Sequence, residues 1–110
     1  MPARTIKEYR LRPAARRDLE RIWIDTAATW GEPQAERYIR DMTKAFALLV
    51  KHPEMARERD ELTPPMRVKR SGSHLVLYQI AEDHIDIIRI RHAREDWMSD
   101  PVGEHSGSEE

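Results

Sequence analysis

Cysteine is absent from the 110 residues, and this absence excludes several functional classes at once. Disulfides, cysteine-ligated zinc, thiol catalysis and redox switching all require a thiol group. The five histidines do not have metal-ligand spacing, so we predict no metal site and no cofactor. Signatures of nucleotide-binding proteins and hydrolases (a P-loop, G-x-G-x-x-G or G-x-S-x-G) are missing as well.

Long apolar runs are equally absent. The first thirty residues contain none that is long enough for a signal peptide or a membrane span, so we expect a cytoplasmic protein without membrane contact. A chain of 13.0 kDa can bury a core without disulfides or metal, and its length indicates a single domain.

The formal net charge of −1 conceals an uneven distribution. Residues 99–110 are small, polar and acidic, and we predict a disordered tail there, after a single domain at residues 1–98. Six basic residues but only three acidic ones lie between Arg67 and Arg94. This excess favours an acidic or anionic partner, although a solvated sheet face would have the same composition.

A short strand and two helices are predicted in the first half of the chain. Alternating residues at 6–12 predict an amphipathic strand. Apolar residues then recur at steps of three and four over 13–30 and over 33–51, which predicts two amphipathic helices. The connection W-G-E-P combines a glycine that can end one helix with a proline that can begin the next. A connection this short predicts an antiparallel helical hairpin.

Three strands are predicted in the second half. Residues 53–65 lack periodicity and are bracketed by prolines, so we expect a loop. Strands are predicted at 67–70, 74–80 and 85–92, and the short turns between them require antiparallel pairing. The element order is β-α-α-β-β-β. We therefore predict an α+β fold, in which the N-terminal helical hairpin packs on one face of a small antiparallel sheet.

The last predicted strand has one face without arginine and one face that mixes isoleucine with arginine. The first consists of Ile88, Ile90 and His92, and the second of Ile85, Ile87, Arg89 and Arg91. We expect the face without arginine to meet the helices and the two arginines to point to solvent on the other side. Trp97, a few residues later, is expected to pack back onto the domain.

Five segments carry a resemblance that composition and periodicity do not reveal. They are YRLRPAARRDLERIW (9–23), TWGEPQAERYIRDM (29–42), LLVKHPEMARERDEL (48–62), RSGSHLVLYQI (70–80) and IDIIRIRHAREDW (85–97). Together they resemble the ParE branch of the ParE/RelE toxin superfamily, which comes from bacterial type II toxin–antitoxin systems. The segments occur in order and at family-like spacing over nearly the whole chain up to Trp97.

The resemblance implies a cytoplasmic toxin that inhibits DNA gyrase by protein contact and blocks replication. It also implies a cognate ParD-like antitoxin, a ribbon-helix-helix protein whose C-terminal segment wraps the toxin. The RelE branch shares the fold but cleaves mRNA on the ribosome. A RelE-like, ribosome-dependent mRNA endonuclease is therefore the alternative.

The two branches differ in the chemistry that they need. Metal-free RNA cleavage requires a group that activates the 2′-hydroxyl, an acid for the leaving oxygen and cations for the phosphate. Lys69, Arg89 and His92 could supply part of this set. RelE-type toxins often add a tyrosine near the C-terminus, but no tyrosine follows Tyr78 here. We therefore predict no catalytic residue and a toxin that is not an enzyme.

The residues expected to contact partners form two groups. Candidates for target contact are the strand residues and neighbours Arg67, Lys69, Arg70, Arg89, Arg91, His92 and Arg94. Candidates for antitoxin binding are Trp23, Trp30, Tyr38, His74 and Tyr78. Structural roles compete with both groups, because aromatics at helical spacing are often core residues and His74 is favoured to hydrogen-bond the turn backbone. Direct DNA binding by this chain alone is not expected, since neither helix is uniformly basic on its outer face.

Overall fold

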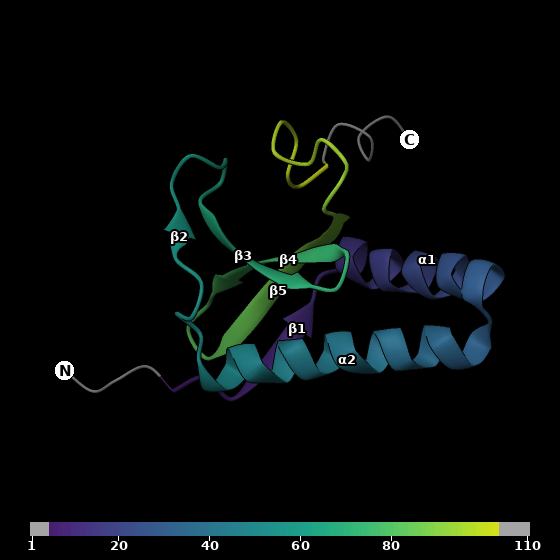
Figure 1. Ribbon diagram of the computed structural model, residues 1–110. Helices are drawn as coiled ribbons and strands as arrows, with labels where there is room; N and C mark the ends of the chain where they lie inside the picture. Colours follow the sequence, from purple (N-terminus) through teal and green to yellow (C-terminus); the bar gives the residue numbers. More distant parts are fainter. Residues whose placement is uncertain (1–4, 104–110) are drawn as a thin grey trace.

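In the computed structural model, which describes residues 5–103, two long helices cover one face of a five-stranded sheet (Figure 1). The elements are β1 (Glu8–Leu11), α1 (Pro13–Trp30), α2 (Glu32–Lys51), β2 (Glu58–Arg59), β3 (Met66–Ser71), β4 (His74–Ile80) and β5 (His84–His92). The predicted α+β class and helical hairpin are confirmed, and β2 is an addition within the predicted loop. Neither of these helices is long and apolar enough to span a bilayer.

Proline and glycine determine where the two helices begin and end. Pro13 lies in the first turn of α1, where its missing N–H costs no hydrogen bond. Gly31 separates the helices with a φ of 95°, a conformation that residues with a Cβ rarely adopt. The Gly31 N–H donates to the carbonyl of Ala27, and the Gly31 carbonyl accepts from the N–H of Ala35. This single residue therefore turns the chain back on itself, and α2 runs alongside α1 (Figure 1).

The strands are arranged in the order β1-β5-β4-β3-β2. β3, β4 and β5 form an antiparallel meander, as predicted, and β2 adds a short antiparallel edge. β1 pairs with β5 in parallel, so the sheet is mixed at this edge and not wholly antiparallel. Parallel pairing needs a long connection, which the helices and the other strands supply here.

The β3–β4 turn has two residues, Gly72 and Ser73, where a three-residue turn was predicted. Gly72 has a φ of 61°, and a Cβ at this position would lie 2.6 Å from the hydroxyl oxygen of Tyr38. Glycine is therefore needed for the backbone conformation and also for the close approach of a side chain from α2.

Apolar side chains pack on both faces of the sheet. The helix-side core consists of Ala15, Ile22, Met42, Phe46, Leu49, Val76, Tyr78, Ile85, Ile87 and Ile90. The opposite core consists of Leu62, Met66, Leu77, Ile88 and Trp97. The chain segments before β3 and after β5 cover this second core. The expectation that this face is open to solvent was therefore wrong. The packing of Trp97 onto the domain is confirmed, and it is 7% exposed.

A β-bulge in β5 explains an error in the predicted strand faces. Ile87 and Arg89 pair with consecutive residues of β4, which leaves Ile88 as an extra residue in β5. Strict alternation therefore fails at this point. Ile85 and Ile87 join the helix-side core together with Ile90, whereas Ile88 lies in the opposite core. The prediction was correct for Ile90 and wrong for the other three isoleucines.

The chain after Trp97 stays packed on the domain as far as the structure describes it. Pro101 is buried and Val102 packs against the opposite core, over the end of β5 (Figure 1). Residues 99–103 therefore differ from the predicted disordered tail. Residues 104–110, the remainder of that predicted tail, lie outside the described residues.

Candidate interaction surface

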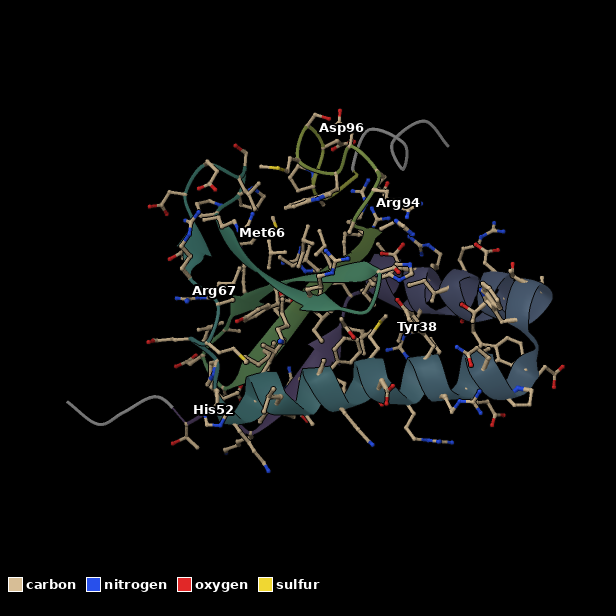
Figure 2. All side chains as sticks on the ribbon, in the orientation of Figure 1. Tyr38, His52, Met66, Arg67, Arg94 and Asp96 are labelled. Carbon is tan, nitrogen blue, oxygen red and sulfur yellow. The ribbon has the colours of Figure 1, made fainter. Side chains whose placement is uncertain are left out.

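A tyrosine and a histidine meet where α2 reaches the β3–β4 turn. Tyr38 points from α2 toward the sheet (Figure 2), and its hydroxyl accepts a hydrogen bond from the Ser73 N–H at 2.8 Å. The same hydroxyl lies 2.7 Å from Nδ1 of His74 but 3.4 Å from the Ser71 carbonyl oxygen. From these two distances we assign the single hydroxyl hydrogen to the contact with Nδ1, the nearer acceptor. The predicted hydrogen bond to the turn backbone comes from Tyr38 and not from His74.

His92 joins this group from the end of β5. Its ring lies edge-to-face against the ring of His74, with centroids 4.9 Å apart and an interplanar angle of 71°. Nδ1 of His92 accepts a hydrogen bond from the Arg94 N–H at 3.0 Å, while the His92 N–H donates to the Glu95 carboxylate at 2.8 Å. Burial, and then the proximity of His92, lower the pKa of His74, because both disfavour the charged imidazolium.

The two histidines line an open cleft of about 470 Å³ between the helices and the sheet. The remaining lining residues are Ile22, Asp25, Thr26, Thr29, Trp30, Gln34, Tyr38 and Ser73. Trp30 lies at the end of α1 and is 72% exposed, so it is not a core residue. An exposed indole beside a cleft is typical of protein-binding surfaces.

Arg89, on the same strand, is held by a carboxylate of α1. Its Nε and Nη2 donate to the two oxygens of Asp18 at 2.7 and 2.9 Å, which is a bidentate ion pair. Asp18 also accepts the N–H of Ile90 at 2.9 Å, at a point where β1 no longer pairs with β5. The hydrogen bonds that Arg89 donates to Asp18 raise the pKa of Arg89 despite its burial. The remaining donor, Nη1, binds the Val102 carbonyl at 2.6 Å.

Arg91 binds the C-terminal segment in a similar way. Its Nη1 donates to the carbonyls of Asp100 and Pro101 at 2.7 and 2.8 Å, and its Nη2 donates to Glu95 at 2.8 Å. This last hydrogen bond lowers the pKa of Glu95. The side chains of Arg89 and Arg91 are only 18% and 12% exposed. The expectation that both point to solvent was wrong, because the chain's own carboxylates and carbonyls surround them.

The other basic candidates are more accessible. Arg70 and Arg94 are exposed, and the Nε of Arg70 donates to the Gly72 carbonyl at 2.9 Å. The Arg94 side chain, labelled in Figure 2, has no hydrogen-bond or ion-pair partner within residues 5–103. Lys69 is half-buried, and Arg67 donates to the Ala56 carbonyl at 2.6 Å.

Two aromatic candidates are not part of the cleft. Tyr78 is fully buried in the helix-side core, and its hydroxyl donates to the Pro53 carbonyl at 2.7 Å. Burial raises its pKa. Tyr78 is therefore a core residue, and this corrects its place among the candidates for antitoxin contact. Trp23 is half-buried on α1.

A second open cleft, of about 1000 Å³, lies at the other end of α2. Its lining residues are Ile6, His52, Pro53, Glu54, Met55, Glu58, Met66, Arg67, Gln79 and Ile80. Figure 2 shows His52 and Arg67 at this end, well away from Tyr38. The predicted residues are thus divided between two ends and two faces of the sheet, and Trp30, Tyr38, His74 and His92 are the four that share one cleft. No three His, Asp or Glu side chains of residues 5–103 are arranged to hold a metal ion.

Sequence reasoning missed Asp18 and Glu95, the two carboxylates that organise β5. Asp18 lies in the predicted first helix but was not among the candidate residues. Its position three residues after Ala15 and four before Ile22 places it at the border of the apolar stripe, and this spacing was the available signal. Glu95 lies four residues after Arg91, but no helical periodicity connects the two, because they belong to a strand and a turn.

The chain resembles known proteins over most of its length. Residues 9–97 match the family described as the ParE toxin of the type II toxin–antitoxin system, parDE. Toxin ParE1 of Mycobacterium tuberculosis is 39% identical over 89 residues, which cover 80% of this chain and 91% of that protein. Toxin ParE1 of Caulobacter vibrioides is 34% identical over 87 residues, covering 79% and 90%.

A solved structure supports the same relationship at the level of the fold. A chain of the chromosomal ParDE TA system from P. aeruginosa superimposes with a TM-score of 0.72, covering 84% of this chain and all of that one, at 16% sequence identity. The family match over residues 9–97 and the identity to two ParE1 toxins agree with this likeness. This chain belongs to the ParE toxin family of type II toxin–antitoxin systems.

Proposed function

We propose that this toxin inhibits DNA gyrase by protein contact in the cytoplasm, without catalysis, and that a ParD-like antitoxin neutralises it. The observation that carries the proposal is the family match across residues 9–97, because gyrase inhibition and a paired antitoxin are what the ParE branch implies. The arrangement of β5 and of the cleft beside it adds physical support.

The geometry of β5 favours contact over RNA cleavage. Arg89 and Arg91 donate to Asp18, to Glu95 and to three backbone carbonyls of the C-terminal segment. To stabilise a cleaved phosphate, both guanidinium groups would have to leave these partners. An active site instead holds its donors ready for the transition state, at no cost during the reaction.

The accessible groups gather at one end of the sheet. Arg70 precedes the β3–β4 turn and Arg94 follows β5, and the pairing of His74 with His92 brings these two strand ends together. The cleft with Trp30 opens at this same end. We infer that gyrase contacts the exposed arginines and that the antitoxin occupies the cleft, so that one partner obstructs the other.

The test is to express the chain alone in bacteria and to assay the purified protein against purified gyrase. We expect filamentation with a DNA-damage response in cells and loss of supercoiling activity in vitro. Arg94→Ala should weaken the inhibition of gyrase, whereas Arg17→Ala, an exposed arginine on α1, serves as the matched control. If translation stops first and ribosome-bound mRNA is cut, the protein is a RelE-like endonuclease and the proposal is overturned.

A further inference from the structure

The hydrogen bonds of His74 and His92 determine which ring nitrogen carries the proton in each neutral ring. With the Tyr38 hydroxyl hydrogen assigned to its shorter contact, Nδ1 of His74 accepts from that hydroxyl, and Nδ1 of His92 accepts from the Arg94 N–H. An imidazole that accepts at Nδ1 must carry its hydrogen on Nε2. Both neutral rings are therefore Nε2–H tautomers, and each has one remaining donor.

These two remaining donors have no partner in the described part of the chain. Neither Nε2 takes part in a hydrogen bond within residues 5–103. Every buried side-chain nitrogen in these residues has a partner, so the two Nε2 atoms are not buried and solvent reaches them. The two rings are in contact, with centroids 4.9 Å apart, and both line the cleft beside Trp30. Two N–H donors are thus presented on one wall of a cleft that the apolar side chains of Ile22 and Trp30 also line.

We propose that this cleft binds the carboxylate of an Asp or Glu side chain of the antitoxin, with the Nε2–H groups of His74 and His92 as its donors. The inference rests on the proposed antitoxin partner and names the chemistry of its contact. A carboxylate only accepts hydrogen bonds, and its two oxygens match two neighbouring donors. The exposed ring of Trp30 and the side chain of Ile22 provide an apolar surface for the methylene groups of the same residue.

The charged groups around the cleft predict the pH dependence of this contact. Asp25 and Asp18 approach from α1, Glu95 from the segment after β5, and Tyr38 from α2. Glu95 and Asp18 favour protonation of His74, while burial and the neighbouring imidazole oppose it and prevail, so the pKa of His74 is lowered. A bound carboxylate would also favour protonation of the imidazole. Binding therefore takes up a proton, and the hydrogen bond to the carboxylate becomes charge-assisted. Affinity should therefore rise as the pH falls from 7.5 to 6.

The first experiment follows the imidazole nitrogens of the full-length protein by ¹⁵N NMR. At pH 7.5 both histidines should show a protonated Nε2 and an unprotonated Nδ1. Sodium acetate, added at constant ionic strength against sodium chloride, should shift the Nε2 resonances of both rings. An Nδ1–H tautomer at either ring would overturn the proposal, as would a response to methylammonium chloride in place of acetate.

A crossed pair of substitutions tests the donor itself. In His92→Asn the side-chain oxygen can replace Nδ1 toward the Arg94 N–H, but no donor reaches the position of Nε2. In His92→Gln the amide nitrogen can replace Nε2, while the bond to Arg94 is lost. We expect His92→Asn to weaken binding of the antitoxin encoded beside this chain's gene by about ten- to a hundredfold. His92→Gln should keep most of the affinity.

The outcomes separate this inference from the proposed function. If the antitoxin does not bind the wild-type chain, while acetate still shifts both rings, the choice of partner is wrong and the carboxylate chemistry stands. If the antitoxin binds His92→Asn as tightly as the wild type, the cleft contact is overturned although the toxin–antitoxin pairing stands. Affinity that does not change between pH 7.5 and 6 would indicate a neutral acceptor, such as a backbone carbonyl, and would also overturn the proposal.

Discussion

Two groups of polar side chains near the C-terminal end of β5, the arginines and the histidines, differ in how their hydrogen-bond donors are satisfied. On one side, Arg89 and Arg91 satisfy their donors with Asp18, Glu95 and the carbonyls of residues 100–102. On the other side, the Nε2 atoms of His74 and His92, which we propose as N–H donors, have no hydrogen-bond partner within residues 5–103 at the wall of a cleft. The ion-paired arginines are therefore structural, and the histidine side is the one that we propose for a partner. Net charge is a poor guide to a binding surface when the chain binds its own charges.

The largest effect is expected from breaking the arginine side. Asp18→Ala removes the bidentate partner of Arg89 and the acceptor of the Ile90 N–H, and it leaves a largely buried guanidinium without compensation. We expect a loss of about 3 kcal/mol in the free energy of unfolding, measured by urea denaturation. Glu20→Ala, an exposed carboxylate on the same helix, should cost less than about 0.5 kcal/mol. Equal stabilities for the two variants would mean that the ion pair does not organise β5.

A smaller loss is expected on the histidine side from Gly72→Ala. Alanine would have to adopt a φ of 61°, and its Cβ would lie 2.6 Å from the Tyr38 hydroxyl oxygen. Tyr38 must therefore move away from His74. We expect a cost of about 2 kcal/mol together with a change in the His74 ring signals in NMR spectra. Gly31→Ala provides the control, because its φ is also positive but its nearest contact would be 3.8 Å. An unchanged His74 signal in Gly72→Ala would show that Tyr38 does not determine the tautomer.

The pH dependence of the free energy of unfolding should distinguish the histidine side, through His74, from the arginine side, through Glu95. Because burial lowers the pKa of His74, the unfolded chain binds more protons than the folded one between the two pKa values, and stability rises with pH across that window. The contribution is complete above the unfolded value of about 6.5 and is lost as the pH falls through the lower folded pKa. The pKa of Glu95 is also lowered, so its contribution is lost only in the acidic range below about 4.3.

Thermal unfolding between pH 7.5 and 5.5 checks this prediction. We expect the midpoint of the wild type to decrease on acidification and that of His74→Asn to decrease less. His52→Asn, at an exposed position at the end of α2, should follow the wild type. A steeper slope in His74→Asn than in the wild type would contradict the depressed pKa of His74.

The sequence predicted the elements well and the faces of β5 poorly, for a physical reason. Helical periodicity, the prolines and Gly31 specify the hairpin locally, and short turns force the antiparallel meander. The bulge at Ile88 depends on packing against both cores, and no residue pattern within the strand marks it. The burial of Arg89 depends on Asp18, 71 positions away in the sequence, and that of Arg91 depends on carbonyls of a segment predicted to be a disordered tail.

The candidate site was predicted in part for the same reason. Tyr38, His74 and Trp30 were singled out as aromatic or imidazole residues of unusual position, and the structure places them around one cleft together with His92. The Nε2–H donors proposed for His74 and His92 could not be predicted from the sequence. They depend on the contacts of the two Nδ1 atoms with the Tyr38 hydroxyl and the Arg94 N–H. Tyr78 was misplaced because a strand position does not reveal whether both faces of the sheet are covered.

The smallest effect is expected at Arg94, the exposed basic residue beside the cleft. Arg94→Ala removes a side chain without partners in residues 5–103 and keeps the backbone N–H that binds His92, so the free energy of unfolding should change by less than about 0.5 kcal/mol. Arg91→Ala is the matched comparison, because it removes the hydrogen bonds that Arg91 donates to the Asp100 and Pro101 carbonyls and to Glu95, and it should cost about 2 kcal/mol. Urea denaturation of both variants measures the difference. A stability loss at Arg94 as large as that at Arg91 would remove the distinction between bound and available arginines, since an arginine that stabilises the fold cannot be displaced toward a partner without cost.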